Sequence, residues 1–238
     1  MDRDGSVTGR TRNWKGDGVP LGLPSDEETT LKARAYRQLK ELILSDALSP
    51  GTFLSERQFA ARLGMSKTPV RLAIERLASE GFLIVSPQQG IVVAEPSLEE
   101  VLELFELRRV LEGYTARRLA GRLTAPQVQR IEENLGAQDA CARTGDVLTY
   151  RKLDTEFHLM LAEYLGNREV RRIMEQAGDR LMRIIFRIVK RQPERMASST
   201  EEHRSILAAI VQGDAELAER RMTQHLEWGQ RFLMSWGL

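Results

Sequence analysis

The chain has 238 residues, of which 42% are hydrophobic, 29% charged and only 6% aromatic. At about 100–200 residues per domain this length predicts one or two domains, and the few aromatic side chains favour an aliphatic, helical core. No apolar run approaches the roughly 18–20 residues that span a bilayer, residues 1–24 lack a signal-peptide pattern, and the single Cys141 precludes an intramolecular disulfide. These features exclude membrane, secreted and collagen-like proteins and predict a cytoplasmic one, with Cys141 as a small packing residue.

The net charge of +1 is unevenly distributed along the chain. Residues 31–96 hold 9 basic and 6 acidic side chains, a balance of +3, whereas residues 97–238 are neutral in balance. This local excess is a mild indication of nucleic-acid binding. Residues 1–28 carry many Gly, Asp, Arg and Pro without apolar periodicity, which predicts a flexible N-terminal extension.

Two helices are predicted first in the chain. Apolar residues recur at helical spacing over 31–45. Ser55 and Gln58 have the spacing of a capping box, which predicts a short helix that ends at Leu63, and Gly64 is a stop signal.

The next elements complete a predicted winged helix-turn-helix domain over residues 29–95. Ser66 is the expected N-cap of a second short helix, 68–80. Two β-branched runs, 82–85 and 91–93, flank a Pro-Gln-Gln-Gly turn and predict a hairpin that serves as the wing.

The start of the second short helix carries residue types that bind DNA. Arg71 can bind guanine bidentately, and its polar neighbours can contact phosphates or base edges. Short helices joined by a Gly turn also occur in proteins that do not bind DNA, but the adjacent hairpin and the local charge favour DNA binding. The candidate DNA-binding residues are Ser66, Lys67, Thr68 and Arg71, with Gln89 and Gly90 at the tip of the wing.

Everything after Pro96 predicts helix, which makes residues 96–238 an all-α antiparallel bundle of about six helices and the whole fold mostly α. The predicted spans are 97–122, 125–143, 146–165, 167–191, 198–212 and 214–235.

All three histidines of the chain lie on predicted buried faces of this bundle. Asp154 and His158 are four residues apart and share one helical face, while His203 and His225 each share a stripe with apolar residues. Buried polar groups need partners. Each histidine could be satisfied separately by a carbonyl or carboxylate, but their joint burial favours a shared divalent metal ion. Zinc is favoured, and nickel or another first-row metal is an alternative.

Four segments, 48–51, 54–60, 64–71 and 77–83, together closely resemble the winged-helix domain of GntR-family transcription regulators. The resemblance implies DNA contacts by Arg57, Lys67, Thr68 and Arg71, with Gly90 at the wing tip. Lys67 departs from the commoner Arg, and a lysine keeps the charge but lacks the planar fork. Leu72 stands where the family often has Glu, a departure to which no functional consequence is attached.

The region from Leu98 to the end resembles the FCD ligand-binding domain of the FadR subfamily of these regulators. Residues 106–112 match its first long helix, and the metal-binding pattern is matched, in order, by Asp154, His158, His203 and His225. The resemblance implies a metal at the floor of an effector pocket that binds small carboxylates. Because the fatty-acyl-CoA responsive relatives lack this ligand set, its presence argues against acyl-CoA.

The same resemblance implies that Arg108 points into the pocket, where a guanidinium would clamp a carboxylate through two hydrogen bonds. Arg109 is the alternative, because one position turns a helix by about 100°.

We therefore expect a homodimeric regulator, by analogy a repressor, that binds double-stranded operator DNA and responds to a small carboxylate. Two alternatives are a metalloenzyme, for which no general base is evident and which leaves residues 31–95 unexplained, and a pure metal sensor.

Overall fold

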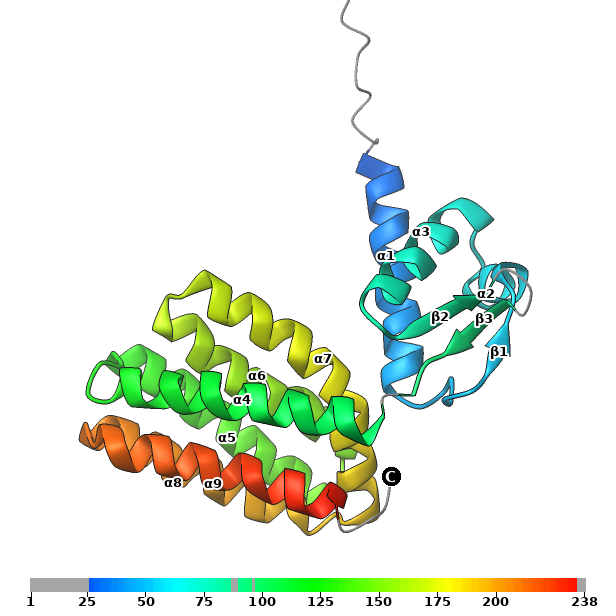
Figure 1. Ribbon diagram of the computed structural model, residues 1–238. Helices are drawn as coiled ribbons and strands as arrows, with labels where there is room; N and C mark the ends of the chain where they lie inside the picture. The colour runs from blue at the N-terminus through cyan, green and yellow to red at the C-terminus, as the bar shows by residue number, and fades with distance from the viewer. Residues whose placement is uncertain (1–25, 87–89, 96, 235–238) are drawn as a thin grey trace, which may run out of the picture.

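The computed structural model of the protein describes residues 26–86, 90–95 and 97–234. A winged-helix unit, formed by three helices and a small sheet, stands beside a bundle of long helices (Figure 1). The predicted fold class is confirmed. Within the described residues, no helix has the length and apolar character needed to cross a membrane.

The winged-helix unit packs around one hydrophobic core, mostly aliphatic, that includes the fully buried Phe59. Its sheet is antiparallel in the order β1-β3-β2. The sequence predicted only two strands, because a run of two residues is too short to show periodicity. The elements are α1 (Asp26–Leu44), β1 (Phe53–Leu54), α2 (Glu56–Leu63), α3 (Lys67–Ser79), β2 (Leu83–Ser86) and β3 (Gly90–Val93).

The predicted helix caps of the winged-helix unit lie at the expected positions, but one of them lacks its capping hydrogen bond. Ser55 and Gln58 form the capping box, and Gly64 ends α2 with a φ of +61°, a conformation that favours glycine. Ser66 is the N-cap of α3, but its side chain makes no capping hydrogen bond, and the helix begins one residue earlier than predicted. Helix α1 begins at Asp26 and so takes in the last residues of the predicted extension.

The bundle contains α4 (Leu98–Leu119), α5 (Ala125–Thr144), α6 (Val147–Leu165), α7 (Arg168–Arg191), α8 (Arg195–Gln212) and α9 (Ala215–Met234). The predicted breaks are confirmed: Gly145, Gly166 and Gly213 adopt left-handed conformations at helix ends. Helix α8 begins three residues before the predicted start. Helix α9 packs along α4, and α6 lies against α4, α5 and α7. Cys141 is buried among apolar side chains, as predicted.

The interior of the bundle is unusual in its polar content. Buried polar groups must find partners, so the number of them in this interior points to specific contacts among them. The buried polar and charged side chains of the bundle are Arg108, Glu112, Thr115, Asn134, Gln138, Arg151, Asp154, His158, Arg195, Ser199, Thr200, His203 and His225.

Candidate functional site

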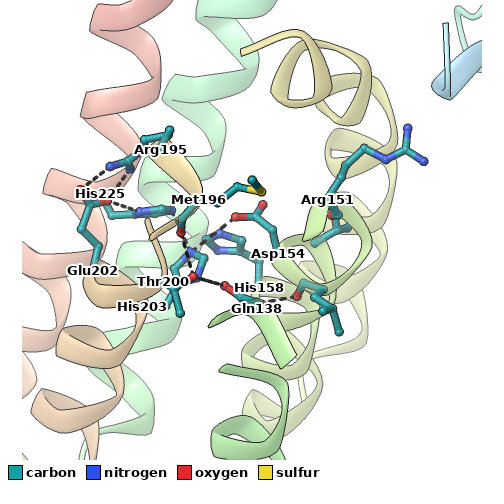
Figure 2. Close-up of polar contacts among 12 residues, drawn as sticks. Gln138, Arg151, Asp154, His158, Arg195, Met196, Thr200, Glu202, His203 and His225 are labelled. Atoms are coloured by element: carbon teal, nitrogen blue, oxygen red, sulfur yellow. Dashed lines mark hydrogen bonds and ion pairs between the residues drawn. The ribbon is translucent and has the colours of Figure 1, made fainter. Parts of the chain in front are cut away.

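Three helices bring the three histidines together. His158 on α6, His203 on α8 and His225 on α9 each offer a ring nitrogen, and these atoms lie within 4.8 Å of one another. The Nε2 atoms of His203 and His225 are 3.2 Å apart, and Asp154 Oδ1 lies 3.7 Å from His203 Nε2. The structure therefore brings the three predicted histidine ligands together inside the bundle and places Asp154, the fourth predicted ligand, beside His203 (Figure 2).

One ring nitrogen of His203, Nδ1, has a fixed hydrogen-bond partner outside the histidine cluster. Its Nδ1 lies 3.0 Å from Gln138 Oε1. Because the amide nitrogen of Gln138 donates to Asn134 Oδ1, at 2.7 Å, the Gln138 oxygen is oriented to accept the His203 Nδ1 proton. With the Gln138 amide and the His203 tautomer assigned in this way, the lone pair of His203 Nε2 is directed at the histidine cluster. Burial also lowers the pKa of His203 well below its usual value, which favours the neutral ring that metals bind.

His225 is held in the same way by a carboxylate. Its Nδ1 donates to Glu202 Oε2 at 2.7 Å, and Arg195 donates two further hydrogen bonds to Glu202, at 2.6 and 2.5 Å. Burial alone would raise the pKa of Glu202, but the hydrogen bonds from Arg195 and His225 lower it to about 2. Burial lowers the pKa of His225 despite the opposing carboxylate. The ring is therefore neutral, with its proton on Nδ1 and a bare Nε2.

The third histidine meets a buried ion pair. His158 Nδ1 lies 2.5 Å from Glu112 Oε2, and Arg108 Nε donates to Glu112 Oε1 at 2.5 Å. Burial would raise the pKa of Glu112, but the charges of Arg108 and His158 lower it to about 2. Among the described residues, both ring nitrogens of His158 and the facing Glu112 Oε2 are buried without a hydrogen bond of normal geometry. An unsatisfied buried nitrogen needs an explanation, and a ligand is one.

The donor set fits a divalent metal ion. The bare Nε2 atoms of His203 and His225 would repel each other at 3.2 Å unless a cation or proton lay between them. Three neutral imidazoles and one carboxylate suit zinc or another first-row metal. Gln138 and Glu202 supply His203 and His225 with the outer hydrogen-bond acceptor that usually supports a metal-ligating histidine.

A cavity of about 50 Å³ opens beside this cluster. Its charged lining includes Asp154, Arg108 and Arg195. The ring of Trp228 covers Arg195, with its centroid 3.8 Å from the guanidinium carbon. Arg108 is buried and faces the cavity, whereas Arg109 is partly exposed and lies 3.7 Å from Glu227. Of the two arginines that the sequence left open, the structure therefore turns Arg108 inward.

The predicted DNA-binding residues lie on the winged-helix unit. Four of them, Arg57, Ser66, Lys67 and Thr68, are exposed. The side chain of Arg71 is 58% exposed and contacts Glu56 of α2 at 3.1 Å. Gly90 begins β3 with a φ of +91°, and Gln89 lies outside the described residues.

The sequence did not identify the outer partners of the histidines, which are Glu112, Gln138 and Glu202, nor Arg195, which pairs with Glu202. Two weak signals were present. Glu112 follows Arg108 by four residues, and Glu202 adjoins His203. Neither signal separates a buried polar pair from an exposed one, because charged pairs at this spacing are common on helix surfaces.

Comparison with known families accounts for both parts of the chain. Residues 31–93 match the model of bacterial regulatory proteins of the gntR family, and residues 103–227 match the FCD domain. The chain is a GntR-family regulator with an FCD domain. This combination is that of the FadR subfamily.

The relatives of this GntR regulator are transcription regulators. It is 30% identical over 195 residues to the HTH-type transcriptional repressor RspR of Escherichia coli, covering 81% of this chain and 84% of that protein. It is also 30% identical over 202 residues to the probable D-xylose utilization operon transcriptional repressor of Paenarthrobacter nicotinovorans, covering 83% and 86%. E. coli McbR/YncC has the same fold, with a TM-score of 0.76 at 24% identity over 87% of this chain and 98% of that one. The metalloenzyme alternative is therefore set aside.

Proposed function

We propose that this GntR regulator represses transcription and leaves its operator when a small carboxylate binds a divalent metal ion in the FCD domain. The observation that carries the proposal is the convergence of three imidazoles and Asp154 beside a cavity that also receives Arg108. Zinc is the favoured ion, with nickel or another first-row metal as alternatives. Repression rests on the two relatives that are named as repressors.

The charges around the site support a metal-dependent effector. Its three carboxylates (Asp154, Glu112 and Glu202) are opposed by only two guanidiniums, so the metal-free site lacks the excess of positive charge that would attract an anion. A bound divalent ion supplies two positive charges and a position for an oxygen ligand. A carboxylate is therefore expected to bind the metal-loaded protein far better than the metal-free one.

The size of the cavity limits the effector. About 50 Å³ corresponds to roughly three or four water-sized positions. A short carboxylate fits this space, whereas a long chain requires side chains to move. The guanidinium of Arg108 is assigned to the effector carboxylate, although its Nε is already committed to Glu112.

The DNA-binding role is assigned to residues 29–95 and the effector role to residues 96–238. The exposed start of α3 would enter the major groove, with the wing beside it. In this proposal operator DNA is contacted by Arg57, Ser66, Lys67, Thr68, Arg71, Gln89 and Gly90.

The regulator is proposed to act as a homodimer. Leu107, Val110 and Tyr114 form an apolar row on α4 with helical spacing, and Val110 is 64% exposed. Such a row is a candidate contact with a second copy. Two winged helices would then bind two half-sites.

The proposal is tested with small carboxylates in a thermal-shift screen on zinc-loaded and chelator-treated protein. A bound ligand raises the unfolding temperature by mass action, so hits should appear only with zinc. Each hit is then titrated against the complex with a selected operator. His158→Ala should lose zinc and the response. Arg108→Met should keep zinc and bind the carboxylate more weakly, while the matched variant Arg109→Met should behave as wild type. A normal effector response in His158→Ala would refute the metal's role.

A further inference from the structure

Arg151 joins the bundle to the winged-helix unit from a fully buried position. It lies on α6, three residues before Asp154, and its side chain is 0% exposed. Its Nη1 donates to the carbonyl oxygen of Leu44 at 2.5 Å, and its Nη2 lies 3.4 Å from Glu41 Oε1. Both partners belong to α1. Figure 2 shows the Arg151 side chain directed away from the histidine cluster.

The carbonyl that Arg151 contacts is the last one of α1. The final carbonyls of a helix have no donor within the helix and need one from elsewhere. Two residues beyond the helix, Asp46 has a φ of +60°, and the Leu48 amide donates back to the carbonyl oxygen of Leu42. A cation at this point also interacts favourably with the helix dipole. The bundle thus supplies the C-terminal cap of the first helix of the other unit.

Stability alone does not account for this arrangement. Arg151 Nε is buried without a hydrogen-bond partner among the described residues, and burial lowers the pKa of Arg151. Burying a guanidinium carries a desolvation cost that can exceed the gain from its contacts, which here are the two oxygens of α1 and the Phe186 ring, whose centroid lies 5.6 Å from the guanidinium carbon. Lys152 reaches the same Glu41 at 3.6 Å from a 60% exposed position, at no such cost. A contact with α1 was therefore available at the surface, so the buried contact made by Arg151 calls for a reason other than stability.

Resting on the function proposed above, we infer that Arg151 is a positioning residue that transmits occupancy of the metal site to the winged-helix unit. Helix α6 carries the two metal ligands Asp154 and His158, so a movement of α6 on ion binding carries Arg151 with it. The moved guanidinium tightens or loosens the cap of α1. Helix α1 packs on α3, and Tyr36 of α1 donates to Glu80 just after α3. A change at the end of α1 therefore reaches the DNA-binding helix.

Hydrogen exchange measures this coupling without a known effector or operator. The full-length protein is compared after chelator treatment and after loading with zinc, and exchange is followed in the peptide 41–48. The backbone bonds of Ser45, Asp46 and Leu48 close the end of α1 in that peptide. Zinc should change the exchange rate there by about fivefold or more, which is the low end of typical coupling between sites.

Three variants separate the buried link from the surface one. Arg151→Met keeps the length of the side chain and should bind zinc as wild type does, with no zinc-dependent change in peptide 41–48. Arg151→Lys keeps a cationic donor for the Leu44 carbonyl and should restore the change. Lys152→Met is the matched control and should respond as wild type.

Two outcomes would overturn the inference in distinguishable ways. If wild-type protein binds zinc but peptide 41–48 does not respond, or if Arg151→Met responds fully, Arg151 transmits nothing and the proposed metal-dependent regulation stands. If wild-type protein binds no zinc, both the inference and the proposed function fail. If Arg151→Met does not fold, Arg151→Gln, which also removes the cationic donor, takes its place, and a full zinc-dependent change in that variant would overturn the inference.

Discussion

Glu202 should control how tightly the site holds its metal without touching the ion. Its carboxylate accepts a hydrogen bond from His225 Nδ1 at 2.7 Å and two more from Arg195. Replacing an outer-shell partner of a metal-ligating histidine typically costs about 10–100-fold in affinity. Glu202→Gln retains an acceptor for His225 but removes the charge, so we expect the lower value of about tenfold. Glu202→Ala removes both and should approach 100-fold, or about 2.7 kcal/mol.

The measurement is a competition titration of zinc against a chromophoric chelator near pH 7. The matched control is Glu201→Gln, because Glu201 is the neighbouring residue, has a 76% exposed side chain and pairs with Arg204 rather than with a histidine. The control should bind zinc as wild type does. Thermal unfolding of the metal-free variants measures the separate cost of leaving Arg195 without its partner. Equal zinc affinity in wild type, Glu202→Gln and Glu202→Ala would show that His225 is not a ligand whose ring this carboxylate orients.

Three further predictions test other parts of the molecule. Arg71→Ala should weaken operator binding by about 1–3 kcal/mol and relax specificity at one base position. Lys67→Ala should mainly lower the salt dependence of binding. Fluorescence titrations of operator DNA at several salt concentrations measure both effects. The Glu112 carboxyl has a pKa of about 2 in the folded protein against a usual 4.5, so its contribution to stability is complete above pH 4.5 and is lost as the pH falls from there towards 2. The unfolding temperature of metal-free protein should fall over that interval, and less steeply in Glu112→Gln. Val110→Glu should convert a dimer to a monomer in light scattering, and a wild-type monomer at operator-saturating concentration would refute the dimer.

Much of the fold could be predicted because its signals are local. The capping box at Ser55 and Gln58 and the left-handed glycines at helix ends act within a few residues of themselves. The elements that were missed or shifted depend on distant partners. Strand β1 exists because Phe53 and Leu54 pair with Val92 and Ile91, about 40 positions further along the chain.

The candidate metal site could be predicted only in part, for the same reason. Asp154 and His158 share a helical face by spacing alone, but the tautomers of the other two histidines depend on pairings that spacing does not reveal: Gln138 pairs with His203, and Glu202, although it adjoins His203, pairs with His225. Periodicity shows which residues point inward. It does not show which of them meet.

Arg108 illustrates how far the outer network constrains the effector. Its Nε is committed to Glu112, which in turn faces His158. A carboxylate that binds Arg108 must therefore share a guanidinium that already pairs with an anion, and the shared charge weakens the attraction. A divalent ion would carry two positive charges, and Asp154 is the one carboxylate among its predicted ligands. A net positive charge would therefore remain to attract the effector. The electrostatic part of effector binding should thus come mainly from the metal, and Arg108 should fix orientation. This division makes effector affinity depend on metal occupancy. The regulator would therefore respond both to the metal ion and to the carboxylate effector.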